Sequence, residues 1–276
     1  MHIHRLPTRS DNYTWVITQA DPARTPQTHC YVVDPGEAAP VLDHCREHGL
    51  SVTGILITHH HYDHVDGVAG LQQAFANAAV IGFGQGPFGD RITQPVKDGE
   101  TLSVLGESFK VIETPGHSDD HVCFYHPQAL FSGDVLFAGG CGKIWDFPPE
   151  KMHRSLMALN ALPGDCLVYC GHEYTYANLM FAHIAEPDNQ AISERLERVR
   201  TLRQNDRCTV PSLLCEEKAT NPFLRYLNTP LERILIERFP ALAHLSQDEP
   251  EAFFAQLRAW KDQLDATDEL EKGLTL

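Results

Sequence analysis

Five residues able to bind a metal ion lie within six consecutive positions, directly after a short apolar segment. The apolar segment is Gly54-Ile55-Leu56-Ile57, and the residues that follow it are Thr58-His59-His60-His61-Tyr62-Asp63-His64. Imidazole and carboxylate groups bind Zn²⁺, Fe²⁺ and Mn²⁺. His59 and His61 point the same way while the chain stays extended, and Asp63 and His64 follow where it must turn. The cluster predicts a hydrolytic metal centre for one or two ions at the end of a buried strand.

Three further residues of metal-binding type follow apolar segments elsewhere in the chain, each next to or near a glycine. They are His117 after Pro115-Gly116, Asp134 after Gly133, and His172 after Gly171. Because strand ends on one edge of a sheet lie close together, we expect these side chains to converge on the histidine cluster. Glycine allows the tight turns that such an approach needs. Each signal is weak alone, but together they predict one shared site.

The chain is acidic, which limits the ligands that it can bind. Of its 276 residues, 37 are acidic and 22 are basic, giving a formal net charge of −15. Binding to nucleic acid normally needs a basic face, so we expect no nucleic-acid partner. The apolar content of 42% is sufficient for one large domain or two smaller ones.

The sequence also indicates the cellular compartment of the protein. No stretch approaches 18 apolar residues, and the segment Met1-His2-Ile3-His4-Arg5-Leu6-Pro7 lacks the apolar centre of a signal peptide. The eight cysteines contain no CxxC pair. We therefore expect a cytoplasmic protein with reduced thiols and without a membrane partner.

Short strand-like segments dominate the first 170 residues, and helical segments lie between them. We expect strands over 13–18, 30–34, 55–58, 79–83, 109–113, 122–126, 129–132 and 167–170, and helices over 40–48, 65–76 and 150–162. This alternation predicts layered packing of the α/β type.

Strand signals almost vanish after residue 172. We expect helices over 174–185, 191–205, 231–239 and 249–264, with loops marked by Pro211, Asn221-Pro222 and Thr229-Pro230. The sequence therefore predicts a second, mainly helical region packed against the first.

The segment His59–His64 carries the pattern HxHxDH and so resembles the metallo-β-lactamase fold superfamily. Within that superfamily the chain is similar to the glyoxalase II, or hydroxyacylglutathione hydrolase, family. The closer resemblance lies in Asp11-Asn12-Tyr13, Cys141-Gly142-Lys143, Gly171-His172-Glu173-Tyr174, Asn221-Pro222-Phe223-Leu224-Arg225, and Arg258 with Lys261. It covers nearly the whole chain, including a helical part that most superfamily relatives lack.

The resemblance implies an α/β fold with two domains and a binuclear centre. It implies a four-layer αββα metallo-β-lactamase-like catalytic domain over 1–172 and a helical substrate-binding domain over 173–276. It also implies two divalent metal ions per chain, for which we expect zinc, with iron or manganese as alternatives. The implied ligands are His59, His61 and His117 for one ion, Asp63, His64 and His172 for the other, and Asp134 between them.

The implied activity is that of a binuclear metal-dependent thioester hydrolase. It would cleave S-(2-hydroxyacyl)glutathione, such as S-D-lactoylglutathione, into a 2-hydroxy acid (D-lactate) and glutathione, the second step of methylglyoxal detoxification. Asp63 and Asp134 would act in catalysis as metal ligands. A hydroxide bound between the two ions would attack the thioester carbonyl. The surplus positive charge of such a centre favours an anionic substrate and a developing oxyanion.

The resemblance also implies the residues that bind glutathione. Lys143, Arg258 and Lys261 would bind its carboxylates, and Tyr174 would donate a hydroxyl hydrogen bond near the metal site. From spacing alone, Arg258 and Lys261 are typical of a solvated helix face, so the resemblance carries this assignment. We expect a monomer that acts on a small-molecule thioester.

Two histidines near the predicted ligands are expected to support the site without binding a metal. His60 should point away from its neighbours, and His121 is a candidate for holding a ligand in place.

Four residues depart from the family pattern. Asp66 and Asp120 stand where glycine is usual, Trp145 occupies an aromatic position where some members have tyrosine, and Phe147 replaces a glycine. The acids could raise metal affinity or repel carboxylates, and the aromatic residues could reshape the pocket. The departures leave every implied ligand in place and the acyl-group preference open.

Three other functions compete with this interpretation. One is a glutathione-persulfide dioxygenase with a single iron, against which the long helical end argues. Another is a lactonase or β-lactamase-like hydrolase with an altered substrate. The third is a non-catalytic metal-binding protein, against which the complete set of ligands and basic residues argues. Residue types do not distinguish zinc, iron and manganese.

Overall fold

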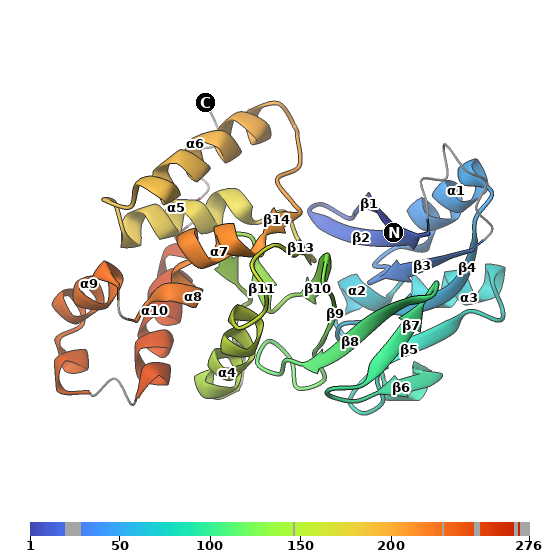
Figure 1. Cartoon of the computed structure of the whole chain (residues 1–276), viewed down its shortest axis with the longest axis horizontal. Coiled ribbons are helices and arrows are strands. Elements are labelled where there is room, and N and C mark those ends of the chain that lie inside the picture. Colours follow the sequence, from blue (N-terminus) through green and yellow to red (C-terminus); the bar gives the residue numbers. More distant parts are fainter. Residues whose placement is uncertain (20–28, 146, 228, 246–248, 268–269, 271–276) are drawn as a thin grey trace.

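Two six-stranded sheets form the part of the molecule at the right in Figure 1, and the helices of the C-terminal region lie at the left. The computed structural model describes residues 1–19, 29–145, 147–227, 229–245, 249–267 and 270. The first sheet has the strand order β1 (His2–Thr8), β2 (Asn12–Thr18), β3 (His29–Val33), β4 (Ser51–Leu56), β5 (Ala79–Phe83) and β6 (Gln94–Val96). The second has the order β14 (Ser212–Leu213), β13 (Leu167–Cys170), β10 (Ala129–Gly133), β9 (Val122–His126), β8 (Glu107–Glu113) and β7 (Thr101–Val104). A separate hairpin pairs β11 (Leu136–Phe137) with β12 (Gly140–Cys141).

Strand β2 shows why the sheets stack. Its side chains alternate between two faces, as they must in an extended chain. Trp15 and Ile17 lie in the core between the two sheets, whereas Val16 lies on the outer face of the first sheet. A strand buried on both faces has to lie in the interior of a layered structure.

Helices cover the outer face of each sheet. α1 (Ala38–His48) and α3 (Val68–Ala74) pack on the first sheet through Val41 and Leu71, and α4 (Pro149–Asn160) packs on the second through Leu156. The layers therefore run helix, sheet, sheet, helix. This arrangement confirms the predicted four-layer αββα sandwich.

The helix predicted over 65–76 is wrong in its bounds. The structure has two helices there, α2 (Tyr62–Val65) and α3, and α2 begins inside the histidine cluster. The amide of Gly67 donates to the carbonyl of Pro35 at 2.8 Å, which draws the chain away from a single helical path. A Cβ at position 67 would lie 2.5 Å from that carbonyl oxygen, so the close approach requires glycine.

Several short elements escaped the sequence-based predictions. Strand β1 is polar and only partly buried, but it pairs with β2 along its whole length. The short strands β6, β7 and β14 and the hairpin β11–β12 were also not predicted. The predicted strand over 55–58 is displaced, because β4 begins at Ser51 and ends at Leu56. The strands β6, β7, β11, β12 and β14 have only two to four residues each, which is too short for a periodic pattern to show in the sequence.

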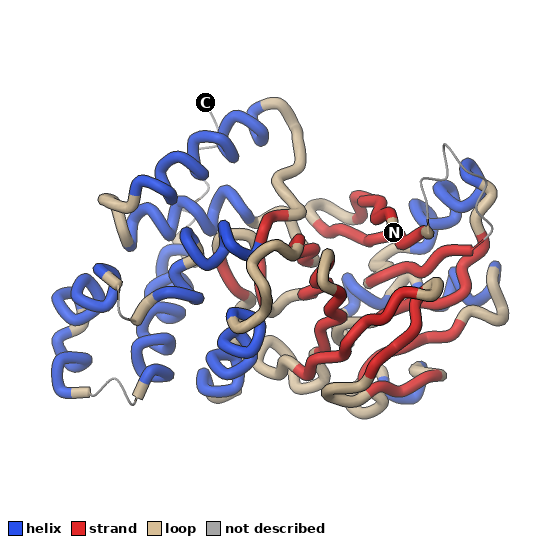
Figure 2. Tube along the Cα trace, viewed as in Figure 1, coloured by secondary structure: helices blue, strands red, loops and turns tan. Residues whose placement is uncertain are grey.

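The residues that the structure describes after Tyr174 are mainly helical (Figure 2). They form α5 (Thr175–Ala185), α6 (Gln190–Gln204), α7 (Leu214–Thr220), α8 (Pro222–Arg225), α9 (Pro230–Arg238) and α10 (Pro250–Asp265). Loops were expected at Asn221 and at Thr229. The side chain of Asn221 caps the start of α8, and the side chain of Thr229 caps the start of α9. The predicted second, helical region is therefore present, and its described residues include two short α-helices, α7 and α8, that were not expected.

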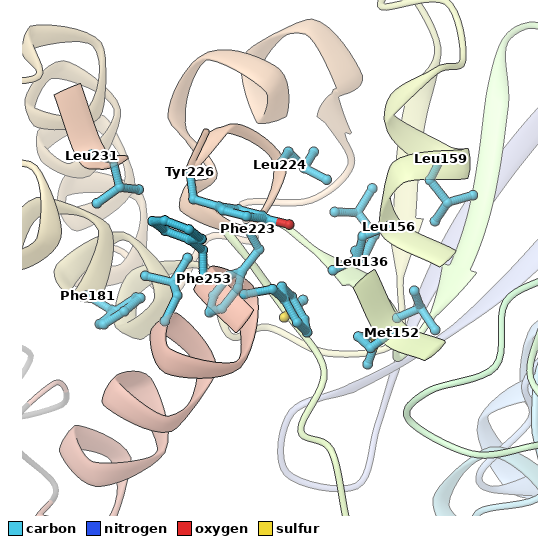
Figure 3. Packing of buried hydrophobic residues seen from close by; sticks show 14 of the residues in the cluster. Leu136, Met152, Leu156, Leu159, Phe181, Phe223, Leu224, Tyr226, Leu231 and Phe253 are labelled. Atoms are coloured by element: carbon cyan, nitrogen blue, oxygen red, sulfur yellow. The ribbon is translucent and has the colours of Figure 1, made fainter. Parts of the chain in front are cut away.

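One apolar core joins this helical region to the second sheet. Figure 3 shows Leu136, Met152 and Leu156 facing Phe223 and Tyr226 of the helical region. Burial of such side chains contributes roughly 1.5–3 kcal/mol each. None of the helices that the structure describes has the length and apolar character needed to cross a membrane.

Candidate metal centre

Four chain segments meet at one edge of the two sheets and carry all seven predicted ligands. His59 and His61 follow β4, and Asp63 and His64 lie in α2. His117, Asp134 and His172 follow the ends of β8, β10 and β13. Strands β8, β10 and β13 run in the same direction, so their carboxyl ends share an edge.

The first group of potential ligands consists of three histidines. Nε2 of His59 lies 3.0 Å from Nδ1 of His61, and Nε2 of His117 lies 2.9 Å from that same Nδ1. The three ligand atoms lie within 4.8 Å of one another, which is close enough for a single ion.

The second group consists of Asp63, His64 and His172. Oδ2 of Asp63 lies 3.7 Å from Nε2 of His64 and 3.3 Å from Nε2 of His172. These three ligand atoms also lie within 4.8 Å of one another.

The carboxylate of Asp134 lies between the two groups. Its oxygens are 3.5 Å from Nε2 of His117, 3.3 Å from Nε2 of His64 and 3.3 Å from Nε2 of His172. Asp134 therefore stands where one carboxylate could contact both ions.

Two buried atoms in this cluster suit a bound cation. Nε2 of His64 and Oδ1 of Asp134 are inaccessible to solvent, and neither makes a hydrogen bond of good geometry, although the two atoms lie 3.3 Å apart. Leaving buried polar atoms unpaired is costly, and native proteins rarely do so without a ligand or water. Imidazole nitrogens and carboxylate oxygens match Zn²⁺, Fe²⁺ or Mn²⁺.

Burial prepares His59 and His61 for metal binding, and neighbouring histidines keep Asp134 ionised. Burial lowers the pKa of His59 well below its usual value and that of His61 to about 4, which favours the neutral imidazole that binds metals. Burial alone would raise the pKa of Asp134, but His172 and His64 hold it well below its usual value. The acid is therefore present as a carboxylate.

Hydrogen bonds fix the orientation of the ligand rings from behind. Nδ1 of His64 lies 3.0 Å from Asp34, and Nδ1 of His172 lies 2.7 Å from Asp11. Nδ1 of His117 lies 2.9 Å from the carbonyl oxygen of Lys143. Such partners hold a metal-binding imidazole in the tautomer and orientation that binding needs.

Asp34 and the roles of Asp11 and Asn12 were not predicted from the sequence. Asn12 donates to the carboxylate of Asp63 at 2.9 Å. A signal for Asp34 was available, since it is a lone acid that directly follows the apolar strand β3. Its φ of 49° is a further sign of a specialised position, but only the structure supplies that angle.

The two supporting histidines lie as expected. His60 turns away from the ligands and contacts the carboxylate of Asp120 at 2.8 Å. His121 is buried, accepts a hydrogen bond from the amide of Asp134 at 3.2 Å and contacts the hydroxyl of Thr114 at 2.8 Å.

Glycine is required at Gly171, the residue before His172. A Cβ there would lie 2.4 Å from Oδ1 of Asp134 and 2.7 Å from Cε1 of His64. The motif glycine therefore allows three ligands from different segments to meet.

A cavity of about 250 Å³ lies beside the cluster, since Tyr174 lines the cavity and contacts the ring of His172. The predicted substrate-binding residues Lys143, Tyr174, Arg258 and Lys261 all line it. The ring of Tyr174 stacks on that of His172, with centroids 4.6 Å apart. The structure thus brings together the metal cluster and residues from opposite ends of the helical region.

Arg258 and Lys261 do not form a solvated helix face. They are only 4% and 5% exposed, and both contact Asp265, at 3.3 Å and 2.5 Å. Burial and the neighbouring Arg258 lower the pKa of Lys261. The spacing-based alternative of a solvated face is therefore wrong.

The four departures from the family pattern have identifiable neighbours. Asp66 pairs with Arg9 at 2.7 Å, and Asp120 accepts from Ser118 at 2.7 Å besides contacting His60. Neither acid lines the cavity.

The two aromatic departures each contact a lysine. Nζ of Lys143 lies 4.5 Å from the ring centre of Trp145, and Nζ of Lys151 lies 5.2 Å from that of Phe147. Trp145 therefore contacts a residue that lines the cavity, whereas Phe147 contacts one that does not.

Stacked sheets with a histidine and carboxylate cluster at one edge define a metal-binding hydrolase of the metallo-β-lactamase class. The family model for the metallo-beta-lactamase superfamily matches residues 13–172, and that for the hydroxyacylglutathione hydrolase C-terminus matches residues 173–264. The chain belongs to the hydroxyacylglutathione hydrolase, or glyoxalase II, family of that superfamily.

Curated relatives agree with this assignment, and solved structures share the fold. The chain is 54% identical to a hydroxyacylglutathione hydrolase of Hydrogenovibrio crunogenus over 99% of both chains, and 44% identical to one of Pseudoalteromonas translucida over 92% of this chain and 95% of that one. ETHE1 from Myxococcus xanthus has a similar fold, with a TM-score of 0.61 and 24% identity over 95% of this chain and 98% of that one. TTHA1623 in a di-iron-bound form has a TM-score of 0.55 and 25% identity over 79% of this chain and 98% of that one.

Proposed function

We propose that this protein hydrolyses the thioester bond of S-(2-hydroxyacyl)glutathione, with S-D-lactoylglutathione as its substrate. The products are a 2-hydroxy acid, D-lactate for this substrate, and glutathione. The reaction is the second step of methylglyoxal detoxification. The observation that carries the proposal is the cavity that holds two buried cations, Arg258 and Lys261, beside the seven-residue cluster.

We propose that two divalent ions bind the cluster. His59, His61 and His117 would hold one, and Asp63, His64 and His172 the other, with Asp134 shared between them. Such ions lower the pKa of a bound water and polarise a carbonyl oxygen. Zinc is the metal that we propose, although the di-iron form of TTHA1623 keeps iron as an alternative beside manganese.

Residues around the proposed ions orient the ligands and supply a hydrogen-bond donor for the substrate. Asp11, Asp34 and the carbonyl of Lys143 keep the ligand rings in place. Burial raises the pKa of Tyr174, so its hydroxyl stays protonated and can donate a hydrogen bond to the substrate.

The charged residues of the cavity would bind the glutathione part of the substrate. Lys143, Arg258 and Lys261 offer donors for its two carboxylates, and charge-assisted hydrogen bonds of this kind contribute roughly 1.5–3 kcal/mol each. Asp265 already pairs with two of these cations, so it would compete with a substrate carboxylate or bind the substrate ammonium group.

We further propose a cytoplasmic monomer. All eight cysteines are free thiols, which suits a reducing compartment. Gel filtration and cell fractionation test the two statements separately.

The decisive experiment combines metal analysis with a turnover assay. We expect two ions per chain and loss of thioester absorbance with S-D-lactoylglutathione, with activity abolished by chelation and restored by added zinc, iron or manganese. His117→Ala should reduce the metal content, whereas the matched variant His126→Ala, in strand β9, should not. Oxygen consumption with glutathione persulfide, in place of thioester hydrolysis, would favour a dioxygenase and overturn the proposal.

A further inference from the structure

The hairpin β11–β12 connects two parts of the candidate site. It begins two residues after Asp134 and ends two residues before Lys143. Its open end is closed by a hydrogen bond from the amide of Gly142 to the carbonyl of Val135 at 3.2 Å. A shift of this hairpin would therefore move the chain on either side of the metal centre.

Side chains of helix α7 and its C-cap hold the hairpin backbone. Nδ2 of Asn221 donates to the carbonyls of Gly140 at 2.9 Å and Phe137 at 3.3 Å. The carboxylate of Glu217 accepts from the amide of Gly139 at 2.7 Å. Asn221 and Glu217 are both fully buried, so solvent cannot replace these bonds.

Two other helices of the same region complete the attachment. Nδ2 of Asn178 in α5 donates to the carbonyl of Ala138 at 3.2 Å, and Nη1 of Arg258 in α10 donates to that of Cys141 at 3.1 Å. The packing is tight as well, since a Cβ at position 140 would lie 2.5 Å from Cγ of Asn178. The helical region thus determines where the hairpin lies.

A buried ion pair supports the attachment. Glu217 pairs with Arg195 of α6, which is 2% exposed and also donates to Thr220 at 2.6 Å. Burying two charges is costly, and an apolar pair of the same size would often stabilise the fold as well. The pair is better explained by its role in positioning, because Arg195 holds the Glu217 carboxylate where it can accept the hydrogen bond from the amide of Gly139.

The hairpin and the residues that follow it contact the candidate site in two places. The chain that leaves β12 presents the carbonyl of Lys143 to Nδ1 of His117 at 2.9 Å. The ring of Phe137 in β11 packs edge-on against His172 and Tyr174, with centroids 5.9 Å and 5.3 Å away. One ligand of each proposed ion therefore depends on where this hairpin lies.

We propose that Asn221 and Glu217 are positioning residues for thioester hydrolysis. They hold the hairpin so that the carbonyl of Lys143 orients His117 while the Lys143 ammonium faces the substrate cavity. The helical region thereby acts on the metal centre as well as on the substrate. This inference rests on the proposed function, but part of its test does not require turnover.

The test uses Asn221→Ser with Asn160→Ser as its matched control. Serine can still cap α8 in place of the Asn221 oxygen that accepts from the amide of Phe223, but it lacks the amide donors that reach the hairpin. Asn160 also makes a long-range side-chain hydrogen bond, at 3.0 Å, but its acceptor is the carbonyl of Leu224 in α8 and not the hairpin. Asn160→Ser therefore measures the effect on activity and stability of losing one such hydrogen bond outside the hairpin.

We expect Asn221→Ser to lower kcat/KM for S-D-lactoylglutathione by about 10- to 100-fold, because small displacements of reacting groups are costly. It should also release zinc to a chelator about tenfold faster, as expected when a partner that orients a ligand is lost. Asn160→Ser should change neither quantity more than about twofold. Melting curves define a temperature at which each variant is folded.

A folded Asn221→Ser protein with wild-type kcat/KM and wild-type zinc release would overturn the inference. If that variant does not fold, Asn178→Ser perturbs the same hairpin at Ala138, and unchanged kinetics and zinc release there would have the same meaning. If the wild-type protein binds zinc but does not hydrolyse the thioester, the proposed function fails, and zinc release alone decides the positioning role.

Discussion

Nδ1 of His64 lies 3.0 Å from Oδ2 of Asp34, and this contact joins the end of β3 to helix α2. Asp34 also accepts hydrogen bonds from the amide of Thr58 at 2.8 Å and from its hydroxyl at 2.6 Å. The acid is 4% exposed and is fully engaged by these partners. It therefore holds His64 with Nε2 facing Asp134.

Replacing Asp34 with Asn should weaken metal binding about 10- to 100-fold. Asparagine keeps the size of the side chain but turns an NH2 group toward either Thr58 or His64, where an acceptor is needed. Competition with a chelator measures the effect, and Asp43→Asn on the exposed face of α1 is the control. Metal affinity within twofold of the wild type would show that His64 does not need this partner.

Replacing Lys143 with Ala should lower kcat/KM by about 10- to 100-fold, because one charge-assisted bond to glutathione is lost. Initial rates with S-D-lactoylglutathione measure it. Lys151→Ala is the matched control, since Lys151 pairs with Asp119 and does not line the cavity. An unchanged kcat/KM in Lys143→Ala would remove this lysine from the substrate site.

The two acids that replace family glycines should affect stability rather than substrate binding. Asp120→Ala leaves His60 and Ser118 without an acceptor, so we expect it to cost about 1–3 kcal/mol. Asp66→Gly removes an exposed ion pair with Arg9 and should cost at most about 1 kcal/mol. Urea unfolding and KM measurements test both. A fall in KM in either variant would show that the acid repels the substrate.

A histidine far from the metal centre should contribute to acid sensitivity. Burial, together with the nearby His48 and His4, lowers the pKa of His44 to about 4. The ring of His44 lies 4.4 Å from that of His48 and 5.3 Å from that of His4, and Glu47 acts in the opposite direction.

The sign of the effect follows from linkage. An unfolded histidine titrates near 6.5, so between about pH 6.5 and 4 the unfolded chain binds a proton that the folded chain does not. The stability from neutral His44 is complete above that window and is lost as the pH falls through it. We expect the melting temperature of His44→Gln to fall less steeply than that of the wild type as the pH is lowered from 6.5 to 4. Both proteins are measured with chelator present. Parallel curves for the two proteins would contradict this.

Local patterns were sufficient for much of the fold. Strands β5, β9 and β13 have the predicted bounds because each is a continuous apolar or aromatic segment closed by turn residues. Local patterns were insufficient for β1, whose polar side chains become a strand only through pairing with β2. They also failed at α2 and α3, where a contact with Pro35 divides the expected helix.

The candidate site divides in the same way. Its seven potential ligands follow from residue type, spacing and resemblance, because each stands at a strand end or in the histidine motif. Asp34 could not be assigned a role, since its partner His64 is thirty residues away and the contact exists only after β3 and β4 pair side by side.

The amino-acid sequence by itself determined which side chains are available for metal binding and where along the chain each strand delivers them, because side-chain chemistry and backbone periodicity are local properties. The tertiary structure alone decided that Arg258 and Lys261 are buried beside the metal cluster, and that Asn221 and Glu217 reach the hairpin between Asp134 and Lys143. Those outcomes depend on how distant segments exclude water from one another, and no local pattern encodes that.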